Sequence, residues 1–347
     1  MAERKQERYL ALDGLRGVCA LSIVLYHAKD LFIEGRLMPR AYLAVDIFFI
    51  MSGFVLALAY EERLAKGLSA RDFVNMRIRR LAPVYWFGCM LGAASLAVFW
   101  HYGLLAGQDA LLLAALAFLL APTSSTFSEA FNVNGPAWSL LSELVVNLLY
   151  AAVAKALSGR ALVAIILIGY AACGFCAALS PDGFNFGWRY ESILLGPVRA
   201  IPSFAAGVLI FRLSRSGDLR RLPDIDPVYP IAAWLLVEMV PTALPALADL
   251  LVVAVLGTLA VALLARSSRQ PRAFAWLGAI SYALYACHYP ILLAAEKTPL
   301  FGFDAGPDPL KAGMLVLVVT GMAWGVHVAL ERRMAFSAAR GKALARR

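Results

Sequence analysis

Charged residues are scarce in this sequence of 347 residues. Only 16% of them are Asp, Glu, Lys or Arg, and 61% are hydrophobic, whereas soluble globular domains carry about 25% charged residues. This shortage of charge excludes an ordinary soluble domain. Apolar runs of a length typical of transmembrane helices recur along the chain instead. The sequence therefore predicts an all-α polytopic membrane protein.

Cysteine is also scarce, and the five cysteines all lie within apolar segments. Cys173 and Cys176 form a CxxC pair, but no His or carboxylate occurs beside them. A metal site needs several such ligands at close spacing, so packing in the core is the favoured role of the cysteines. We expect no bound metal.

The sequence lacks an internal repeat and any long hydrophilic loop. Many transporters are built from inverted repeats with interrupted helices, so the lack of a repeat counts against a transporter. The lack of a long loop indicates a single membrane domain over residues 1–347. We expect a short tail at 1–8, a transmembrane bundle at 9–330 and a basic tail at 331–347.

Eleven apolar segments are candidate transmembrane helices. Lys and Arg are enriched in the cytoplasmic loops of membrane proteins, and here they lie in short loops and near the ends of the chain. That pattern explains the net charge of +9 better than nucleic-acid binding does. The expected segments are 9–28, 41–60, 83–101, 109–121, 138–156, 161–179, 192–211, 229–247, 249–265, 274–295 and 311–330.

The short segment 109–121 decides the topology. If it crosses the membrane fully, the basic clusters at 212–221, 266–272 and 332–347 fall outside the cytoplasm. If it is re-entrant or lies in the outer half of the bilayer, ten helices cross and the basic clusters face inward. We expect this second arrangement, with both termini cytoplasmic.

The first segment carries charged groups at membrane depth, namely Asp13, Arg16 and His27. Such groups cost several kcal/mol each and usually face a bundle interior or a water-filled cavity. Arg16 and His27 are 11 residues apart, which places them on nearly the same helix face, about 16 Å apart along the axis. The expected orientation puts Arg16 in the cytoplasmic half and His27 near the outer end.

The second segment places Asp46 near its outer end and Gly53 at mid-membrane, where a glycine favours close helix packing. Before the third segment, Ser69 and Asp72 predict the start of a helix.

Beyond that start, Arg77 and Arg80 project from one helix face, with Arg79 nearby. They could anchor the helix at the membrane surface. They could equally bind phosphate, because a guanidinium group holds a phosphate through two hydrogen bonds.

A polar stripe runs down segment 138–156. Ser139, Glu143, Asn147 and Tyr150 follow one another at helical spacing. A lone buried Glu could be a structural hydrogen-bond partner, but a whole stripe favours the lining of a cavity.

A second stripe in segment 274–295 comprises Ser281, Tyr285 and His288, and Pro290 predicts a kink beside it. The expected topology brings His27, Glu143 and His288 towards the outer side, with the arginines on the inner side. A neutral imidazole is well suited to take a proton from a hydroxyl group near neutral pH. The pattern indicates an acid–base centre that receives an anionic substrate from the cytoplasm.

Five stretches of the sequence resemble the acyltransferase-3 family of integral membrane acyltransferases. They occur in the family's order along nearly the whole chain, and the Arg16-to-His27 spacing and the R-x-x-R of Arg77 and Arg80 are family hallmarks. One departure is Val146-Asn147, where many members have an aromatic-Tyr pair, so Tyr150 has no clear counterpart. The stretches are LDGLRGVCALSIVLYHA (12–28), VDIFFIMSGF (45–54), RIRRLAPVYW (77–86), NGPAWSLLSE (134–143) and SYALYACHYP (281–290).

The resemblance implies transfer of an acyl group, usually acetyl, from acyl-CoA to a hydroxyl of a polysaccharide, lipopolysaccharide or other glycan at a bacterial inner membrane. The nucleotide phosphates would bind Arg77 and Arg80, with Arg79 nearby, and the pantetheine arm would pass Arg16. His27 would deprotonate the acceptor hydroxyl or carry the acyl group transiently.

The resemblance also gives Glu143 and His288 a part in catalysis, either orienting the general base or stabilising developing charge. The expected partners are acyl-CoA, a glycan or glycolipid acceptor and the lipid bilayer, with no nucleic acid and no metal. The residues expected to support the site are Asp13, Asp46, Ser139, Ser281 and Tyr285.

Two other classes of protein remain open. A transporter or flippase of a glycolipid or anionic solute would also contain many helices and buried charges. A scaffolding subunit of a polysaccharide assembly complex would need no polar stripes. Label transfer from acetyl-CoA distinguishes the enzyme, and movement of a solute without chemistry distinguishes the transporter.

Overall fold

The computed structural model describes residues 9–33, 37–124, 129–241 and 245–344 of the chain, with side chains described up to residue 330. Helices make up the secondary structure of these residues, apart from an isolated β-bridge between Glu129 and Arg189. The prediction of an all-α membrane protein is confirmed at this level. The α-helices are α1 (Leu10–His27), α2 (Lys29–Phe32), α3 (Ala44–Ala65), α4 (Ala70–His101), α5 (Gly107–Phe118), α6 (Ala137–Val153), α7 (Gly159–Leu179), α8 (Leu195–Ser216), α9 (Val228–Met239), α10 (Ala246–Leu251), α11 (Thr258–Arg266), α12 (Ala273–Lys297) and α13 (Pro309–Leu344).

Short helices of other types join these elements. The 3-10 helices are η1 (Ala41–Leu43), η2 (Tyr190–Ser192), η3 (Asp218–Arg221) and η5 (Pro299–Phe301), and η4 (Val252–Gly257) is a π-helix between α10 and α11. Among the described residues, 8 helical stretches are long and apolar enough to cross a membrane, while α5, α6 and α9 are shorter apolar helices.

Every predicted segment coincides with a helix, but the expected span at 229–247 is wrong in its length. Helix α9 ends at Met239, and Val240 already has an extended backbone. Val240 precedes Pro241, and the proline ring disfavours the helical conformation of the residue before it. The sequence therefore carried the signal that ends this helix early.

Helix α4 begins earlier than the predicted segment 83–101. The side chain of Ser69 accepts a hydrogen bond from the backbone N–H of Asp72, as the helix-start signal predicted. The helix has 32 residues, or about 48 Å at 1.5 Å per residue. Because the hydrocarbon core of a bilayer is about 30 Å thick, such a helix can extend beyond it and carry the arginines of its first turns to the membrane surface.

Helix α5 corresponds to the short segment 109–121. It has 12 residues, which extend over only about 18 Å. Its last carbonyl groups accept hydrogen bonds from the side chains of Tyr85 and Trp86, which lie in the middle of α4. Helix α5 therefore runs back along half of α4 and ends there, as expected for a re-entrant segment.

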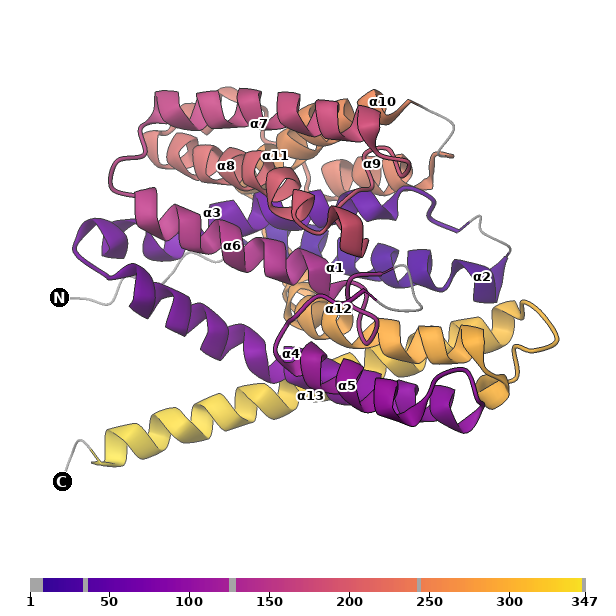
Figure 1. The fold of residues 1–347 in the computed structure, drawn as a ribbon. Coiled ribbons are helices and arrows are strands. Elements are labelled where there is room, and N and C mark those ends of the chain that lie inside the picture. The colour runs from indigo at the N-terminus through magenta and orange to yellow at the C-terminus, as the bar shows by residue number, and fades with distance from the viewer. Residues whose placement is uncertain (1–8, 34–36, 125–128, 242–244, 345–347) are drawn as a thin grey trace.

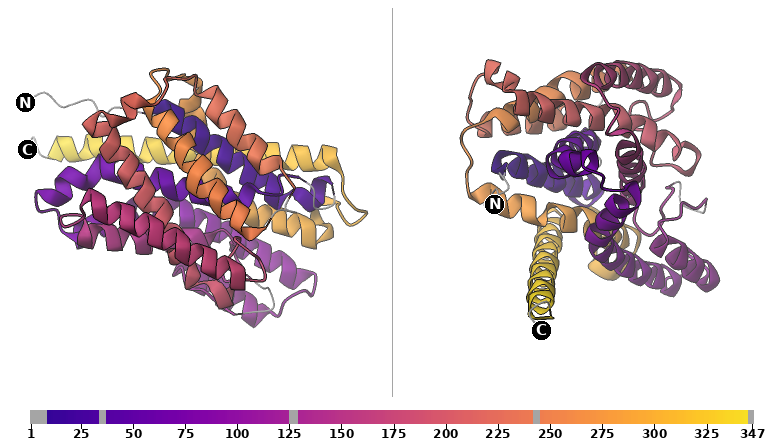
Figure 2. Two further views of the ribbon diagram at one scale, coloured as in Figure 1. Left: turned by 90° about the horizontal axis from the view of Figure 1, so that it is seen from above. Right: turned by 90° about the vertical axis from the view of Figure 1, so that its left-hand side faces the viewer.

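The helices lie in three groups, as Figures 1 and 2 show. Helices α7 to α11 form one side of the bundle, and α4, α5, α12 and α13 form the other. Helices α1, α3 and α6 lie between the two sides, and the far end of α13 projects away from the bundle. The central position of α1 and α3 places their polar residues inside the protein.

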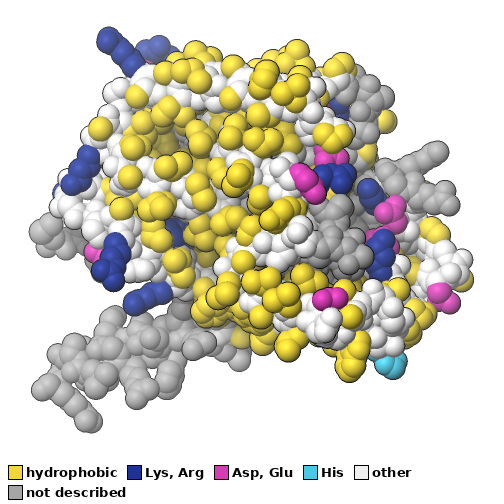
Figure 3. Space-filling view, in the orientation of Figure 1, with side chains coloured by type: hydrophobic (Ala, Val, Ile, Leu, Met, Phe, Trp, Pro, Cys, Tyr) yellow, Lys and Arg dark blue, Asp and Glu magenta, His cyan; other side chains and the backbone are white. Residues whose placement is uncertain are grey.

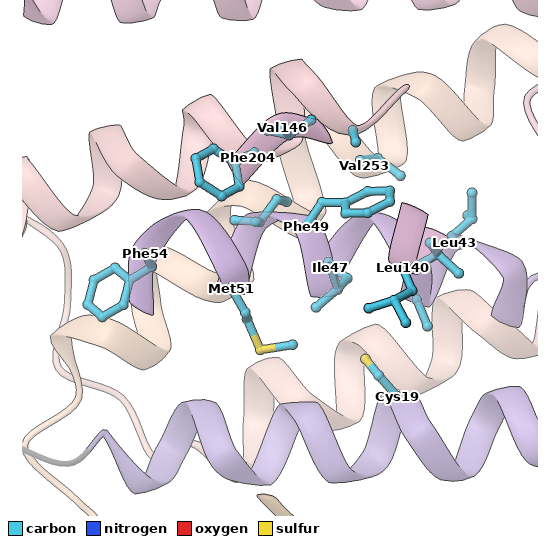
Figure 4. Close-up of a cluster of buried hydrophobic side chains, with 14 of the residues drawn as sticks. Cys19, Leu43, Ile47, Phe49, Met51, Phe54, Leu140, Val146, Phe204 and Val253 are labelled. Atoms are coloured by element: carbon cyan, nitrogen blue, oxygen red, sulfur yellow. The ribbon is translucent and has the colours of Figure 1, made fainter. Parts of the chain in front are cut away.

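Helices α3 and α8 pack with their backbones in contact. A Cβ atom on Gly53 would lie 2.0 Å from the carbonyl oxygen of Phe204, and one on Gly207 would lie 1.9 Å from that of Ile50. The prediction that Gly53 permits close packing is confirmed, since no larger residue fits at either position. Buried apolar side chains fill the space around this contact, as Figure 4 shows for Ile47, Met51 and their neighbours.

The outer surface is hydrophobic across the middle of the molecule (Figure 3). Figure 3 shows Lys and Arg side chains at both ends. Those at the left end, which carries the connections from α3 to α4 and from α6 to α7 (Figure 1), have few acidic neighbours, whereas those at the right end lie beside Asp and Glu. His27 belongs to the opposite end, where α1 leads into α2. The molecule thus has a basic end and an end that carries the histidine.

Candidate functional site

Two histidines from different helices meet near the end of the bundle. His27 is the last residue of α1, and its Nδ1 atom lies 2.9 Å from Nε2 of His288 on α12. Close packing of the two helices brings them together: a Cβ atom on Gly17 would lie 2.3 Å from Cβ of Leu277, and one on Gly14 2.6 Å from the Phe274 ring. The glycines of the LDGLRG stretch thus allow α1 to pack closely against α12, and this packing positions His27 next to His288.

The second nitrogen of His288 fixes the direction of this hydrogen bond. Nδ1 of His288 lies 2.9 Å from the carbonyl oxygen of Leu284. A carbonyl can only accept, so Nδ1 of His288 carries the proton, and in the neutral ring Nε2 is an acceptor. His288 is fully buried, which favours its neutral form. It follows that Nδ1 of His27 donates to His288 and that Nε2 of His27 keeps a free lone pair.

Two tyrosine rings enclose His27. The ring centroids of Tyr26 and Tyr289 lie 5.2 and 5.0 Å from that of His27, and both rings meet it edge-on. The hydroxyl of Tyr289 donates to the carboxyl group of Glu129 in the loop before α6. Burial raises the pKa of Glu129 to about 7.

The sequence did not single out Glu129 or Tyr289. Tyr289 follows His288 directly in the SYALYACHYP stretch, which is a signal that was available. Glu129 lies in a loop without periodicity, where no pattern identifies a partner for Tyr289.

The predicted stripe of α12 divides in the structure. The hydroxyl of Tyr285 lies 2.7 Å from Oγ of Ser139 on α6, and its ring centroid is 6.1 Å from that of His288. Ser281 instead donates to the carbonyl of Gly278 in its own helix. Tyr285 and Ser139 are therefore neighbours of the histidine pair, and Ser281 stabilises its own turn of α12.

Pro290 lies inside α12 and leaves one carbonyl of that helix free to bind the turn before α6. A proline has no N–H, so the carbonyl of Ala286 loses its usual helical donor. The side chain of Asn134 supplies a replacement at 2.7 Å. The NGP turn is thus bound to α12 at Ala286, two residues before His288.

Glu143 makes its hydrogen bonds with α3 and α4. Its Oε1 atom accepts hydrogen bonds from NH2 of Arg77 at 2.8 Å and from Oγ of Ser52 at 2.9 Å. Glu143 lies one helical turn beyond Ser139, where α6 faces these two helices. Its expected grouping with His27 and His288 stays a prediction.

The arginines of α1 and α4 lie on the other side of Glu143. Arg77 is only 6% exposed, and its Nε atom is buried without a hydrogen-bond partner among the described residues. Arg16 pairs with Asp13 at 3.3 Å and interacts electrostatically with Arg77 and Arg80. Arg77 is therefore a buried, carboxylate-bound residue rather than an open phosphate ligand.

Arg80 and its neighbour Arg79 are exposed. Because Arg80 also lies within electrostatic range of Arg77 and Arg16, an anion that binds at Arg80 would interact with all three guanidinium groups.

Pairwise interactions link these groups into what we call the polar track. Arg80 and Arg16 interact with Arg77 and Glu143. Glu143 also interacts with Tyr285, whose ring centroid lies 6.1 Å from that of His288. The elements that supply it are α1, α4, α6 and α12. Its charge is positive at the arginine end and neutral at the histidine pair, so the two ends can bind different parts of a ligand.

Asp46 belongs to a different cluster, which corrects its expected place beside the site. Its carboxylate binds Nε and NH2 of Arg199 on α8 at distances of 2.6 to 3.2 Å. Both side chains are fully buried. Arg199 was not singled out, although an arginine within the predicted segment 192–211 was a visible signal of a buried partner.

Asn147 and Tyr150 continue the stripe of α6 into the core. Both are buried, and their polar side-chain atoms have no hydrogen-bond partner among the described residues. His101 is exposed at the end of α4, and the His327 ring packs 5.5 Å from that of Trp324. In the part of the chain searched, no group of three or more His, Cys, Asp or Glu could hold a metal ion.

Comparison with known proteins adds a family to this geometry. The model of the acyltransferase-3 family, described as an acyltransferase domain, matches residues 9–329. The protein called "Protein 2 in picA locus" of Rhizobium radiobacter is 42% identical over 164 residues, which are 44% of this chain and 85% of that protein. No solved structure matches the chain.

Two relatives with an activity in their names match over a shorter stretch. The "Putative peptidoglycan O-acetyltransferase YrhL" of Bacillus subtilis is 38% identical over 84 residues, 23% of this chain and 12% of that protein. The "O-acetyltransferase OatA" of Staphylococcus aureus is 32% identical over 83 residues, 23% of this chain and 13% of that protein. The matches thus cover only a small part of either O-acetyltransferase.

Proposed function

Because this chain belongs to the acyltransferase-3 family, whose model matches residues 9–329, we propose that it moves an acyl group, most simply acetyl, from acyl-CoA to a hydroxyl group of a cell-surface glycan. Family membership makes it an acyltransferase. The coenzyme A donor, the glycan acceptor and the roles of individual residues are the proposed parts. The names of the two O-acetyltransferases support the choice of a hydroxyl acceptor.

One observation carries the proposal: the hydrogen bond of 2.9 Å between Nδ1 of His27 and Nε2 of His288. With His288 held by the Leu284 carbonyl, His27 keeps the tautomer in which Nε2 can accept a proton. General-base catalysis by such a histidine accelerates a reaction by about 10²- to 10⁴-fold. His288 is then a positioning residue, because it orients His27 without touching the substrate.

The proposed reaction has two steps. In the first, Nε2 of His27 takes the proton of the acceptor hydroxyl while the hydroxyl oxygen attacks the thioester carbonyl. The carbon–sulfur bond then breaks, and the sulfur of coenzyme A leaves with the proton that His27 returns. If His27 carries the acyl group instead, Nε2 attacks the thioester carbonyl and the carbon–sulfur bond breaks, which releases the thiolate of coenzyme A. The acceptor oxygen then displaces Nε2 from the acyl carbon, and the hydroxyl proton passes to the thiolate.

The arginine end of the polar track suits the nucleotide part of the donor. Coenzyme A carries several phosphate groups, and Arg80, with Arg79 beside it, offers exposed guanidinium groups for them. Arg16 and Arg77 add positive charge further along, and Glu143 holds Arg77 in place. The narrow pantetheine arm would follow the track towards His27.

The proposed orientation has ten membrane crossings and both termini in the cytoplasm of a bacterial cell, in its inner membrane. The ten are the 8 long apolar stretches together with α6 and α9, while α5 enters and turns back. Helix α9 is as short as α5, with 12 residues, and it is counted as a crossing because the basic clusters at 212–221 and 266–272 then lie on the same side. Support comes from the basic residues that gather at the end opposite His27 (Figure 3). In this arrangement one membrane domain receives its donor from inside and its acceptor from outside.

The test is a transfer assay with the purified chain in lipid nanodiscs. Acetyl-CoA labelled on the acetyl group is added together with cell-envelope glycan, and label on the glycan and free coenzyme A are both measured. We expect label on the glycan together with at least an equal amount of free coenzyme A, because hydrolysis by water also releases coenzyme A, and neither product in a His27→Ala variant. Transfer that persists in that variant would contradict the mechanism, and movement of solute without release of coenzyme A would favour a transporter.

A further inference from the structure

A polar cavity opens beside Tyr26, the residue before His27, at the end of the bundle opposite Arg16, Arg77 and Arg80. Its volume is about 340 Å³, and it is lined by Tyr26, Lys29, Tyr42, Asp182, Ala246 and Asp249 among others. Small-molecule sites typically occupy about 300–1,000 Å³. The cavity is therefore large enough for a single small ring.

The cavity adjoins His27 through one aromatic ring. Tyr26 lines the cavity, and the same ring lies edge-on against His27 with centroids 5.2 Å apart. The Lys29 ammonium covers the Tyr26 ring at 5.1 Å from its centroid. A molecule in the cavity thus lies one side chain away from the proposed base.

Ion pairs with two arginines hold the two carboxylates of the cavity in place. Asp182 binds Nε and NH2 of Arg189 at 2.6 and 3.1 Å. Asp249 accepts from the hydroxyl of Tyr42 and lies 3.0 Å from Arg40, yet its Oδ1 atom has no hydrogen-bond partner among the described residues. Both carboxylates are fixed in place, and Asp182, whose side chain is only partly buried, is the one that can accept a hydrogen bond from a ligand.

The lining combines two kinds of surface. The rings of Tyr26 and Tyr42 offer flat apolar faces, and the carboxylates and the Lys29 ammonium offer charged hydrogen-bonding groups. A sugar ring has the matching chemistry, because its C–H groups form apolar patches and its hydroxyl groups donate and accept hydrogen bonds. A phosphate-rich nucleotide does not match, since two carboxylates would face it.

We propose that this cavity is the acceptor subsite, and that it holds a sugar ring with several free hydroxyl groups so that one of them reaches His27. The inference rests on the proposed acyl transfer and adds the place and chemistry of the acceptor. It also separates the two substrates: the donor enters along the arginines, and the acceptor enters from the histidine end.

Filling the cavity tests the inference. Ala246 is a half-buried lining residue at the start of α10, and the next residue, Leu247, is exposed and does not line the cavity. The Ala246→Trp variant should lose acetyl transfer to envelope glycan while its hydrolysis of acetyl-CoA by water stays at the wild-type rate. Leu247→Trp adds the same side chain outside the cavity and should keep both activities.

A second pair of variants separates recognition from structure. Asp182→Asn and Arg189→Gln both break one ion pair, but only the first removes a carboxylate from the cavity. Asp182→Asn should raise KM for N,N′-diacetylchitobiose, used as the acceptor probe, by about tenfold or more, as the loss of a charged hydrogen bond does. Arg189→Gln should raise it much less, and neither should change KM for acetyl-CoA.

The outcomes distinguish this inference from the function it rests on. Wild-type glycan transfer in Ala246→Trp, or equal effects of Asp182→Asn and Arg189→Gln on the acceptor KM, would overturn the acceptor subsite alone. The same holds if Ala246→Trp loses hydrolysis and transfer equally although the protein is folded. Wild-type protein without His27-dependent acyl transfer would overturn the proposed function and this inference with it.

Discussion

Two buried arginines, Arg199 and Arg77, show how differently this protein treats the same side chain. Arg199 is fully buried, pairs with Asp46 through two nitrogens and gives further hydrogen bonds to the carbonyls of Tyr42 and Phe186. Arg77 gives one hydrogen bond to Glu143, and its buried Nε atom has no hydrogen-bond partner within the described part of the chain. All three nitrogen atoms of the Arg199 guanidinium group thus donate hydrogen bonds. In Arg77, the Nε atom donates none to the described residues.

The groups that surround Arg199 and Arg77 also differ in charge. Aromatic rings of Tyr42, Trp138 and Phe184 surround Arg199, within 6.0 Å of its guanidinium carbon. Arg77 interacts with two further arginines, Arg16 and Arg80. A neutralised and enclosed pair holds helices together, whereas an excess of positive charge leaves a place for an anion. The scaffold and the candidate site can therefore be separated by experiment.

The largest expected effect concerns the histidine pair. His27→Ala should lower kcat for acyl transfer by about 10²- to 10⁴-fold, because it removes the proposed base. His288→Ala should lower it less, and the double variant should be no slower than His27→Ala, since the two act as one unit. Release of coenzyme A by purified variants measures this, with His101→Ala as the control.

The second effect should appear in folding instead of activity. Arg199→Met leaves Asp46 buried without its partner, which costs about 3–5 kcal/mol. The yield of folded protein after solubilisation should fall sharply, and the molecules that do fold should keep the wild-type rate per molecule. A normal yield and normal thermal stability of Arg199→Met would contradict the structural role of Arg199.

A smaller effect is expected at the exposed end of the polar track. Arg80→Gln should raise KM for acetyl-CoA by about tenfold with little change in kcat, since it removes one phosphate contact. The difference from wild type should shrink as salt is added, because ions screen exposed charges. Arg71→Gln, nearer the start of α4, serves as the control. An equal rise of KM in Arg71→Gln would show that the donor responds only to the overall positive charge and not to a site at Arg80.

The smallest effect should be a pH dependence of stability. Burial raises the pKa of Glu129 from 4.5 to about 7, so the folded protein holds this proton more tightly than the unfolded chain does. The resulting stabilisation is complete below the lower of these values and is lost as the pH rises through the higher one. The thermal midpoint of wild type should therefore fall between pH 5 and pH 8 relative to Glu129→Gln, and parallel curves would contradict it.

Local patterns in the sequence predicted most helices and the separation of Arg16 from His27. Hydropathy located the helices, and Ser69 located the start of α4. Each of these features depends on neighbouring residues or on composition. The early end of α9 was equally local, because Pro241 determines it, and it was missed only because apolar residues continue beyond it.

The partners of charged residues could not be predicted. Periodicity correctly placed Glu143 and Ser139 on one face of α6, but it does not say which helix that face meets. Glu143 binds Arg77, which is 66 residues away, and Asp46 binds Arg199, which is 153 residues away. Such pairings depend on how the helices pack, and here glycines such as Gly17 and Gly53 determine that packing.

Helix α5 has a consequence for the lipids around the protein. It extends over about 18 Å, and Leu111 and Leu112 on it, with Leu119 directly after it, are exposed. A segment shorter than the hydrocarbon core makes the bilayer thin beside it. Lipids next to α4 and α5 should thus be compressed, and the protein should prefer membranes with short acyl chains, where this deformation is least.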